Sequence, residues 1–303
     1  MSLDAAFDTL ALSPETRRFA ALALLRPHQW IKNAFVAAPL FFTPWALTAD
    51  SVATVGLGVV AFSALASAVY VLNDYVDRAA DRLHPEKSRR PLAAGTVSVP
   101  MAFAFMGLLL AIGLGIAFGL STGFAALALA YLVVNLGYSF GLKHVAIMDV
   151  LLIALGFVLR VEAGSVLIGV ESSAWIVIAS GLLALFLALA KRRDDVVRSL
   201  GGEHRRSLDG YNRVFLDTAL AVVLGALLVA YLIYTTDAAV MARLGTDRLF
   251  YTAPFVVAGV LRFLQITLVE ERSGAPTRIV ATDPFLIGSV TGWALAFALL
   301  IHG

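Results

Sequence analysis

Nine long apolar runs constrain the fold of this chain more than any other feature. They lie at residues 31–49, 53–75, 99–119, 121–140, 146–168, 173–191, 214–236, 250–268 and 284–302. Each run is close to the roughly 20 residues that a helix needs to cross a bilayer core. Only 15% of the 303 residues are charged and 60% are hydrophobic, which is rare in a soluble domain of this length. We therefore expect an all-α integral membrane protein with nine transmembrane helices.

The segment before the first run has a different character. Residues 1–28 are expected to lie at the membrane interface as an amphipathic segment, with Ser13 and Pro14 starting a short helix. Asp4 and Asp8 interrupt any apolar stretch there, which argues against a signal peptide. No soluble linker or repeat divides the chain, so one membrane domain is expected over residues 1–303. The chain has no cysteine, which excludes disulfides and thiolate chemistry.

Positive charge is distributed unevenly between the two ends of these runs. Most of the 23 lysines and arginines lie before the first run and in the second, fourth, sixth and eighth connections. The opposite connections contain only Arg243 and Arg248. The positive-inside rule then predicts a multi-pass protein of the inner (plasma) membrane, with its N-terminus and even-numbered loops in the cytoplasm. Nine spans leave the C-terminus on the other side.

Three aspartates follow the second run within "NDYVDRAAD", residues 73–81. If the helix continues, Asp74, Asp77 and Asp81 share one face, because they are spaced by three and four residues. Like charges at this spacing repel one another, and a bound Mg²⁺, which prefers carboxylate and phosphate oxygens, would relieve the repulsion. The alternative is a set of ordinary helix ion pairs through Arg78.

A basic loop, "HPEKSRRPLAAG", follows at residues 84–95. Anchoring by the positive-inside rule needs its cations but not the neighbouring carboxylates. A diphosphate site needs both, because Mg²⁺ bridges acid to phosphate while Lys87 and Arg90 bind the remaining oxygens. Pro85, Pro91 and Gly95 are expected to bend the loop back over the aspartates.

Further polar residues lie at the same predicted membrane face. They come from "YSFGLKHVAIMD" (residues 138–149) and "ALAKRRDD" (residues 188–195). Arg160 lies near mid-membrane, where a cation is costly and serves either a structural partner or an anionic substrate. Lys32, beside Trp30, either snorkels to the interface or binds a lipid phosphate. Gly115 and Gly119 form a GxxxG pattern typical of close helix packing.

These motifs resemble a known family. "NDYVDRAADR…RRPLAAG" is similar to the first aspartate-rich motif of the UbiA superfamily of intramembrane prenyltransferases, N-D-x-x-D-x-x-x-D followed by a basic R-P-L stretch. The second acidic motif of members that prenylate aromatic rings is not found. Instead, "RPHQWIKN", "HPEKSRRPLAAG", "YSFGLKHVAIMD" and "AKRRDD" resemble the polyprenyl-phosphate (decaprenyl-phosphate) phosphoribosyltransferase branch.

The resemblance implies a UbiA-like bundle with a cytoplasmic-side active site and Mg²⁺ as cofactor. It implies transfer of 5-phosphoribosyl from 5-phosphoribosyl-1-diphosphate to a polyprenyl phosphate within the lipid bilayer, with no nucleic acid as partner. The catalytic and metal-binding residues would be Asp74, Asp77 and Asp81, and the substrate-binding residues Lys32, Asn33, Asn73, Lys87, Arg90, Tyr138, Lys143, Asp149, Arg160, Lys191 and Arg192.

Two other functions are open to the sequence. One is a UbiA-type prenyltransferase that moves a prenyl group from a prenyl diphosphate to an aromatic acceptor. The other is a transporter of phosphorylated solutes, although the paired halves and broken helices common in transporters are not evident from the sequence.

Overall fold

The computed structural model describes residues 22–85, 87–198 and 206–302, and within these ranges no residue lies in a β-strand. The long helices are α3 (Ala49–Val76), α5 (Val99–Leu120), α6 (Thr122–Ser139), α7 (Met148–Leu167), α8 (Ala174–Val197), α9 (Arg213–Thr236), α11 (Ala253–Leu268) and α13 (Pro284–His302). The short α-helices are α2 (Ala38–Phe41), α4 (Arg78–Leu83), α10 (Ala238–Leu244) and α12 (Pro276–Thr282). The 3₁₀ elements are η2 (Pro27–Ala37), η3 (Pro44–Ala46), η4 (Lys87–Arg89), η5 (Leu142–His144), η6 (Arg206–Gly210) and η7 (Leu249–Thr252).

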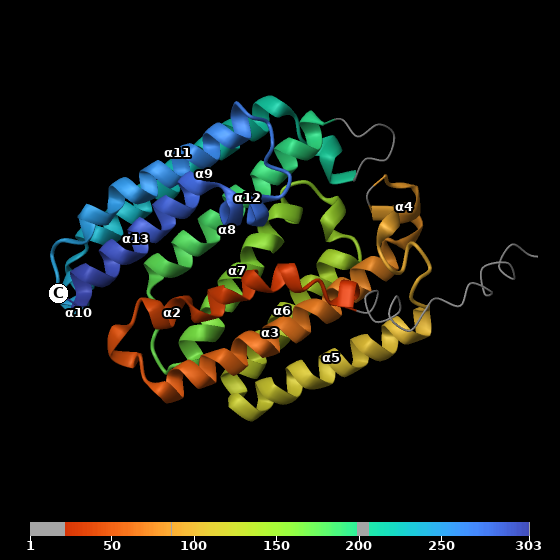
Figure 1. Ribbon diagram of the computed structural model, residues 1–303, viewed down its shortest axis with the longest axis horizontal. Coiled ribbons are helices and arrows are strands. Elements are labelled where there is room, and N and C mark those ends of the chain that lie inside the picture. The colour runs from red at the N-terminus through yellow and green to blue at the C-terminus, as the bar shows by residue number, and fades with distance from the viewer. Residues whose placement is uncertain (1–21, 86, 199–205, 303) are drawn as a thin grey trace, which may run out of the picture.

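The long helices run side by side in one bundle (Figure 1). Eight described helical segments are long and apolar enough to cross a membrane, counting η7 with α11. They correspond to the last eight of the nine runs expected from the sequence, and the all-α membrane fold is confirmed. Residues 1–21, which include most of the predicted interfacial segment with Arg17 and Arg18, lie outside the described residues, as do residue 86 and the loop 199–205.

The first expected span, residues 31–49, is not one continuous α-helix. It consists of η2, α2 and η3 in succession. Pro39 and Pro44 lack the backbone N–H that a continuing α-helix needs, which explains the breaks. The segment still lies along the bundle, because η2 packs against both α3 and α7 and runs beside α3 in the opposite direction (Figure 1). At about 2 Å per residue, the 11 residues of η2 cover roughly two-thirds of a bilayer core.

Helix α3 lies at the centre of one half of the bundle. In the most apolar 18-residue stretch of α3, 67% of the residues are buried, whereas in that of α5, which faces outward, 17% are buried. Phe62 and Leu65 of α3 form a core with residues of α5, α6 and η2. A second core joins α8 to α9 and α11, and the packing of α7 against α8 connects the two halves.

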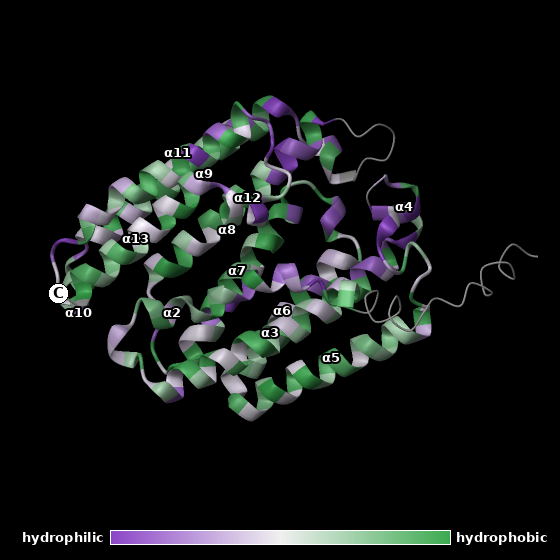
Figure 2. Cartoon of the chain, in the orientation of Figure 1, coloured by the Kyte–Doolittle hydropathy of each residue, from purple (hydrophilic) through white to green (hydrophobic). Residues whose placement is uncertain are grey.

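Hydrophilic residues gather at the end of the bundle that carries α4 (Figure 2). The expected even-numbered loops meet there. Asp77 of the second loop pairs with Lys143 of the fourth, and Arg192, at the start of the sixth, pairs with Asp149. The sequence therefore grouped these loops correctly at one end of the bundle.

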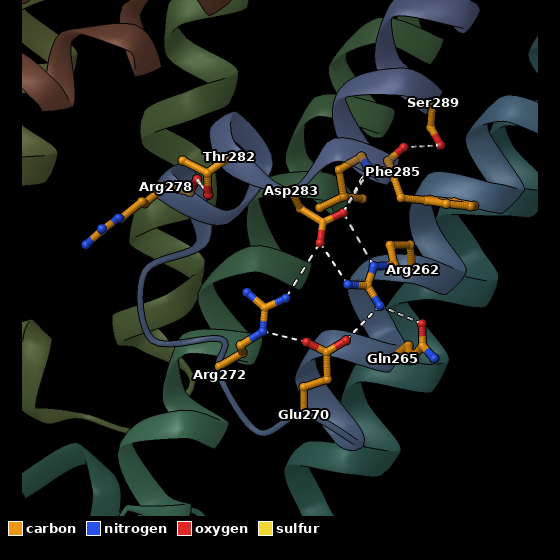
Figure 3. Close-up of polar contacts among 10 residues, drawn as sticks. Arg262, Gln265, Glu270, Arg272, Arg278, Thr282, Asp283, Phe285 and Ser289 are labelled. Carbon is orange, nitrogen blue, oxygen red and sulfur yellow. Dashed lines mark hydrogen bonds and ion pairs between the residues drawn. The ribbon is translucent and has the colours of Figure 1, made fainter.

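The eighth connection is held by a charged cluster between α11 and α13 (Figure 3). Arg262 of α11 donates to Asp283 (2.8 Å) and Glu270 (2.7 Å), and Arg272 donates to Glu270 (2.5 Å). These hydrogen bonds hold the pKa of Asp283 and that of Glu270 below their usual values. A surface hollow lined by Arg262, Gln265 and Asp283 lies beside the cluster, and none of the site residues predicted from the sequence lines it.

Close packing at glycine occurs elsewhere than the GxxxG pattern suggested. A Cβ on Gly115 or Gly119 would have no neighbour within 4 Å. A Cβ on Gly113 of the same helix would come within 3.1 Å of the Ala61 carbonyl oxygen on α3. The expectation that the GxxxG face packs a neighbouring helix is therefore wrong for this chain, because α5 presents its Gly113 face to α3.

Candidate active site

The three aspartates of the predicted stripe lie at the charged end of the bundle, on either side of a break in the helix. Helix α3 ends at Val76, Asp77 caps it, and α4 begins at Arg78. The expected continuous helix is interrupted at Asp77, and the expected shared face holds for Asp74 and Asp81, which both contact Arg90, but not for Asp77, which pairs with Lys143. Asp74 and Asp81 are buried, with 2% and 4% of their surfaces exposed, whereas 35% of the Asp77 side chain is exposed.

Asp74 and Asp77 each have a cationic partner from a distant part of the chain. The Arg26 guanidinium donates to Asp74 Oδ1 (2.5 Å), and burial lowers the pKa of Arg26 while Asp74 opposes that shift. Lys143 Nζ donates to Asp77 Oδ1 (2.5 Å) and reaches Asn73 Oδ1 at 3.5 Å. Arg78, which the sequence suggested as a helix partner of the aspartates, forms no ion pair with any described residue.

Arg90 bridges the two buried aspartates. One nitrogen, Nη1, lies 3.1 Å from Asp74 Oδ1 and 2.7 Å from Asp81 Oδ2. The two carboxylates thus converge on a single cationic position.

This arrangement fits Mg²⁺ in a specific way. Among the residues that the structure describes, no three Asp, Glu, His or Cys side chains are arranged as a ready-made metal site. Mg²⁺, however, usually binds through one or two carboxylates together with substrate phosphates. Asp74 and Asp81 supply two converging carboxylates, so the donor set fits Mg²⁺ once phosphate oxygens complete it. Asp77 points instead to Lys143, and its role as a metal ligand stays a prediction.

The basic loop folds back over this cluster, as its prolines and glycine suggested. Arg82 Nε donates to the Ala93 carbonyl (3.2 Å), which ties the end of α4 to the far side of the loop. Gly95 has φ +74°, a conformation that favours glycine. Lys87 is exposed on η4, while Arg90 reaches inward. The loop therefore delivers Arg90 to the carboxylates.

Asp149 lies at a junction beneath the fourth loop and is fully buried. It accepts from Tyr211 (2.6 Å), Arg192 Nε (2.8 Å) and Ser207 (3.1 Å). With three donors on its two oxygens, Asp149 connects α7, α8 and the η6 loop. The geometry supports a positioning role for Asp149 more than the ribose contact predicted from the resemblance.

Tyr211 extends this junction to the backbone of the fourth loop. Its hydroxyl accepts from the Ile147 N–H (2.6 Å) at a residue with φ +70°. Burial, and then the hydrogen bond to Asp149, raise the pKa of Tyr211, so the phenol stays protonated and donates. The loop 142–147, which presents Lys143 to Asp77, is thereby fixed.

Arg160 lies deeper, within α7, and is 4% exposed. It donates to Asn33 Oδ1 (2.8 Å), the Gly156 carbonyl (2.7 Å) and the Tyr131 hydroxyl (3.0 Å). Asn33, itself fully buried, donates to Ser63 of α3 (2.9 Å). This network joins the first segment to α3, α6 and α7.

The remaining predicted residues lie around these groups. Tyr138, near the end of α6, is close enough to Arg192 for an electrostatic interaction. Lys191 is close enough to Lys32 for electrostatic repulsion between the two cations. Lys32 is half-buried and lies beside Asn33 on η2.

The sequence did not identify several residues that build the site. Arg26 was counted only among the cations before the first run that set the predicted orientation, yet it pairs with Asp74. Tyr131, Ser207 and Tyr211 carried no motif, and their roles follow from hydrogen bonds across more than 25 residues. The only available signal was for Arg26, which lies in the same cation-rich end as the aspartates.

The sequence profile of the UbiA prenyltransferase family matches residues 30–290. This range is most of the chain, so the protein belongs to the UbiA prenyltransferase family and is a membrane transferase.

Two curated relatives cover nearly the same length. The chain is 31% identical to the decaprenyl-phosphate phosphoribosyltransferase of Corynebacterium glutamicum, over 95% of this chain and 89% of the relative. It is 34% identical to the enzyme of the same name from Mycolicibacterium smegmatis, over 86% of each. Among solved structures, a UbiA homolog from Archaeoglobus fulgidus bound to GPP and Mg²⁺ has a TM-score of 0.69 at 23% identity, covering 92% of this chain and 99% of that one. That likeness confirms the fold.

Proposed function

We propose that this protein transfers 5-phosphoribosyl from 5-phosphoribosyl-1-diphosphate to a polyprenyl phosphate of decaprenyl type and releases diphosphate. The observation that carries the proposal is the convergence of Asp74 and Asp81 on one cationic position, with three cations around the aspartates. The two relatives named for this reaction support the choice of donor and acceptor.

The donor diphosphate fits the aspartate cluster. Mg²⁺ held by Asp74 and Asp81 would neutralise the leaving diphosphate and stabilise its developing charge. Arg26, Arg90 and Lys143 now pair with carboxylates and are placed to bind phosphate oxygens. Arginine suits this task, because its planar fork matches the geometry of phosphate.

The transfer itself needs few groups. An oxygen of the acceptor phosphate forms a bond to C1 of the ribose while the bond from C1 to the diphosphate oxygen breaks. The acceptor phosphate is already ionised near neutral pH, so no side chain has to remove a proton. The protein's task is to hold two anionic groups close together in a site with little water, where fixed cations act strongly.

The charge distribution also supports an orientation. We propose that the end of the bundle with α4, η5 and the α8 terminus faces the cytoplasm of an inner (plasma) membrane, by the positive-inside rule. A water-soluble donor would reach the aspartates from that side, and a lipid acceptor would enter laterally. Residues 1–303 would then form one membrane domain around this site.

The proposal is tested with purified protein in lipid nanodiscs, Mg²⁺, polyprenyl phosphate and donor labelled in the ribose. We expect label in the lipid fraction, lost in Asp74→Asn. A matched variant, Asp247→Asn, changes an exposed aspartate (84%) of an opposite loop and should keep wild-type activity. Prenylation of an aromatic acceptor from a prenyl diphosphate, without labelled lipid, would reject the proposal in favour of the prenyltransferase.

A further inference from the structure

Among the residues that the structure describes, Arg160 is a buried cation with no acidic partner. Its three hydrogen bonds go to an amide oxygen, a carbonyl oxygen and a hydroxyl, and no carboxylate pairs with it in the described part of the chain. Glu162, two residues away, accepts from Ser172 instead (2.7 Å). A cation within a membrane segment is costly and usually marks a ligand or ion pathway.

A second cation without a counter-ion lies beside it. Across the described ranges, no carboxylate or hydrogen-bond acceptor contacts the Lys32 ammonium, and its electrostatic neighbours are Lys191, Arg160 and Arg26. Of these, Arg26 is already neutralised by Asp74. Lys32 and Arg160 therefore leave an excess of positive charge between η2 and α7.

The Arg160 guanidinium is held rigidly. It lies 4.6 Å from the ring centroid of Tyr131 and 5.4 Å from that of Phe157, and Asn33 is anchored to Ser63. Such a fixed cation needs no reorganisation when an anion arrives. A buried cation that no carboxylate neutralises is costly, and in a membrane segment such a cation favours a role in binding an anion.

The location indicates which anion binds. Ser63, which anchors Asn33, lies 11 residues before Asp74 on α3, or about three turns deeper along the helix. Trp30 and Ile31, next to Lys32 on η2, are large apolar side chains that are 38% and 55% exposed. Exposed apolar side chains on a membrane bundle are expected to face lipid, so we expect an anion at Lys32 to approach from the lipid side.

We propose that Lys32 and Arg160 form a second phosphate site, which holds the phosphomonoester head of the lipid acceptor. This site is distinct from the aspartate cluster assigned to the donor diphosphate, and the assignment of its ligand rests on the proposed function. The other phosphomonoester of the reaction, on the 5-position of the donor ribose, has the same chemistry, and the experiment separates the two.

The test measures binding and kinetics of Lys32→Gln. Because the Lys32 side chain makes no hydrogen bond or ion pair with any described residue, this variant should fold normally. Arg160→Lys is the second variant and keeps the buried charge without the guanidinium bonds. Binding of a fluorescent polyprenyl phosphate is compared with that of the matching polyprenol in nanodiscs without donor. Arg248→Gln, at an exposed position (72%) of an opposite loop, is the control.

We expect both variants to weaken polyprenyl phosphate binding about tenfold, the equivalent of one charge-assisted contact, with polyprenol binding unchanged. The acceptor KM should rise and the donor KM should stay within about twofold. An increase confined to the donor KM would assign the site to the donor ribose phosphate and overturn the proposal, as would unchanged lipid binding. Phosphate-dependent lipid binding that Lys32→Gln removes would uphold the site even if the wild-type protein transferred no phosphoribosyl group.

Discussion

Gly164 of α7 is the position where one methyl group should disturb the whole site. A Cβ there would lie 2.9 Å from the Val36 carbonyl carbon and 3.1 Å from Pro39 Cδ, and closer still to the Val36 carbonyl oxygen. Non-bonded carbon atoms prefer a separation of about 3.5–4.0 Å. Gly164→Ala must therefore push the first segment away from α7 by at least roughly 0.5–1 Å.

That displacement acts on the Arg160 network one turn away. The bond from Arg160 Nε to Asn33 Oδ1 is 2.8 Å long and joins the same two elements. Lengthening it by about 0.5–1 Å takes it beyond good hydrogen-bond geometry. We expect a stability loss of about 1–3 kcal/mol from overpacking, and a fall in kcat/KM of about 100-fold from misplacement of the site.

The assay combines thermal unfolding in nanodiscs with steady-state kinetics for both substrates. Gly115→Ala is the matched control, because a Cβ there meets nothing within 4 Å; it should unfold at or slightly above the wild-type temperature. A Gly164→Ala protein with wild-type unfolding temperature and acceptor KM would refute the argument that the close approach of η2 to α7 maintains the site.

Three further outcomes follow from the charged end. Arg90→Ala should raise the donor KM by about tenfold, which is the loss of one charged hydrogen bond. Mn²⁺ binding without donor, measured by electron paramagnetic resonance, should not weaken. Weaker Mn²⁺ binding would contradict the proposal that a metal takes the position now held by Arg90 between Asp74 and Asp81. Tyr211→Phe removes a hydrogen-bond donor to a buried carboxylate oxygen of Asp149. The free energy of unfolding should fall by about 1–3 kcal/mol, which would be seen as a lower unfolding temperature. An unchanged unfolding temperature would contradict a stabilising role for this hydrogen bond. The pKa of Asp283 is lowered in the folded protein. The ionised Asp283 carboxylate therefore stabilises the fold above the usual carboxyl pKa, and this stabilisation is lost as pH falls through the lowered value. The decrease in unfolding temperature at acid pH should be smaller in Arg262→Gln, and an identical pH profile would refute the linkage.

Local sequence determined the helices and their sidedness. A run of about 20 apolar residues has to satisfy its backbone hydrogen bonds internally in a bilayer, and only a helix does so within one segment. The last eight runs therefore became long helices. The alternating distribution of cations likewise grouped the even-numbered loops at one end, where Asp77 meets Lys143. The aspartates and Arg90 were evident as candidates because their spacing lies within one short motif.

Only the tertiary structure decided which charge meets which. Arg160 bonds to Asn33 across 127 residues, and Arg26 bonds to Asp74 across 48 residues. Pairs so far apart in the sequence cannot be predicted from the spacing of residues along one helix. The close approach of η2 to α7 also depends on packing, since it is possible only where Gly164 has no side chain. Sequence fixes where a helix is possible through local backbone chemistry, whereas the partners of buried charges depend on long-range contacts that form when the helices pack.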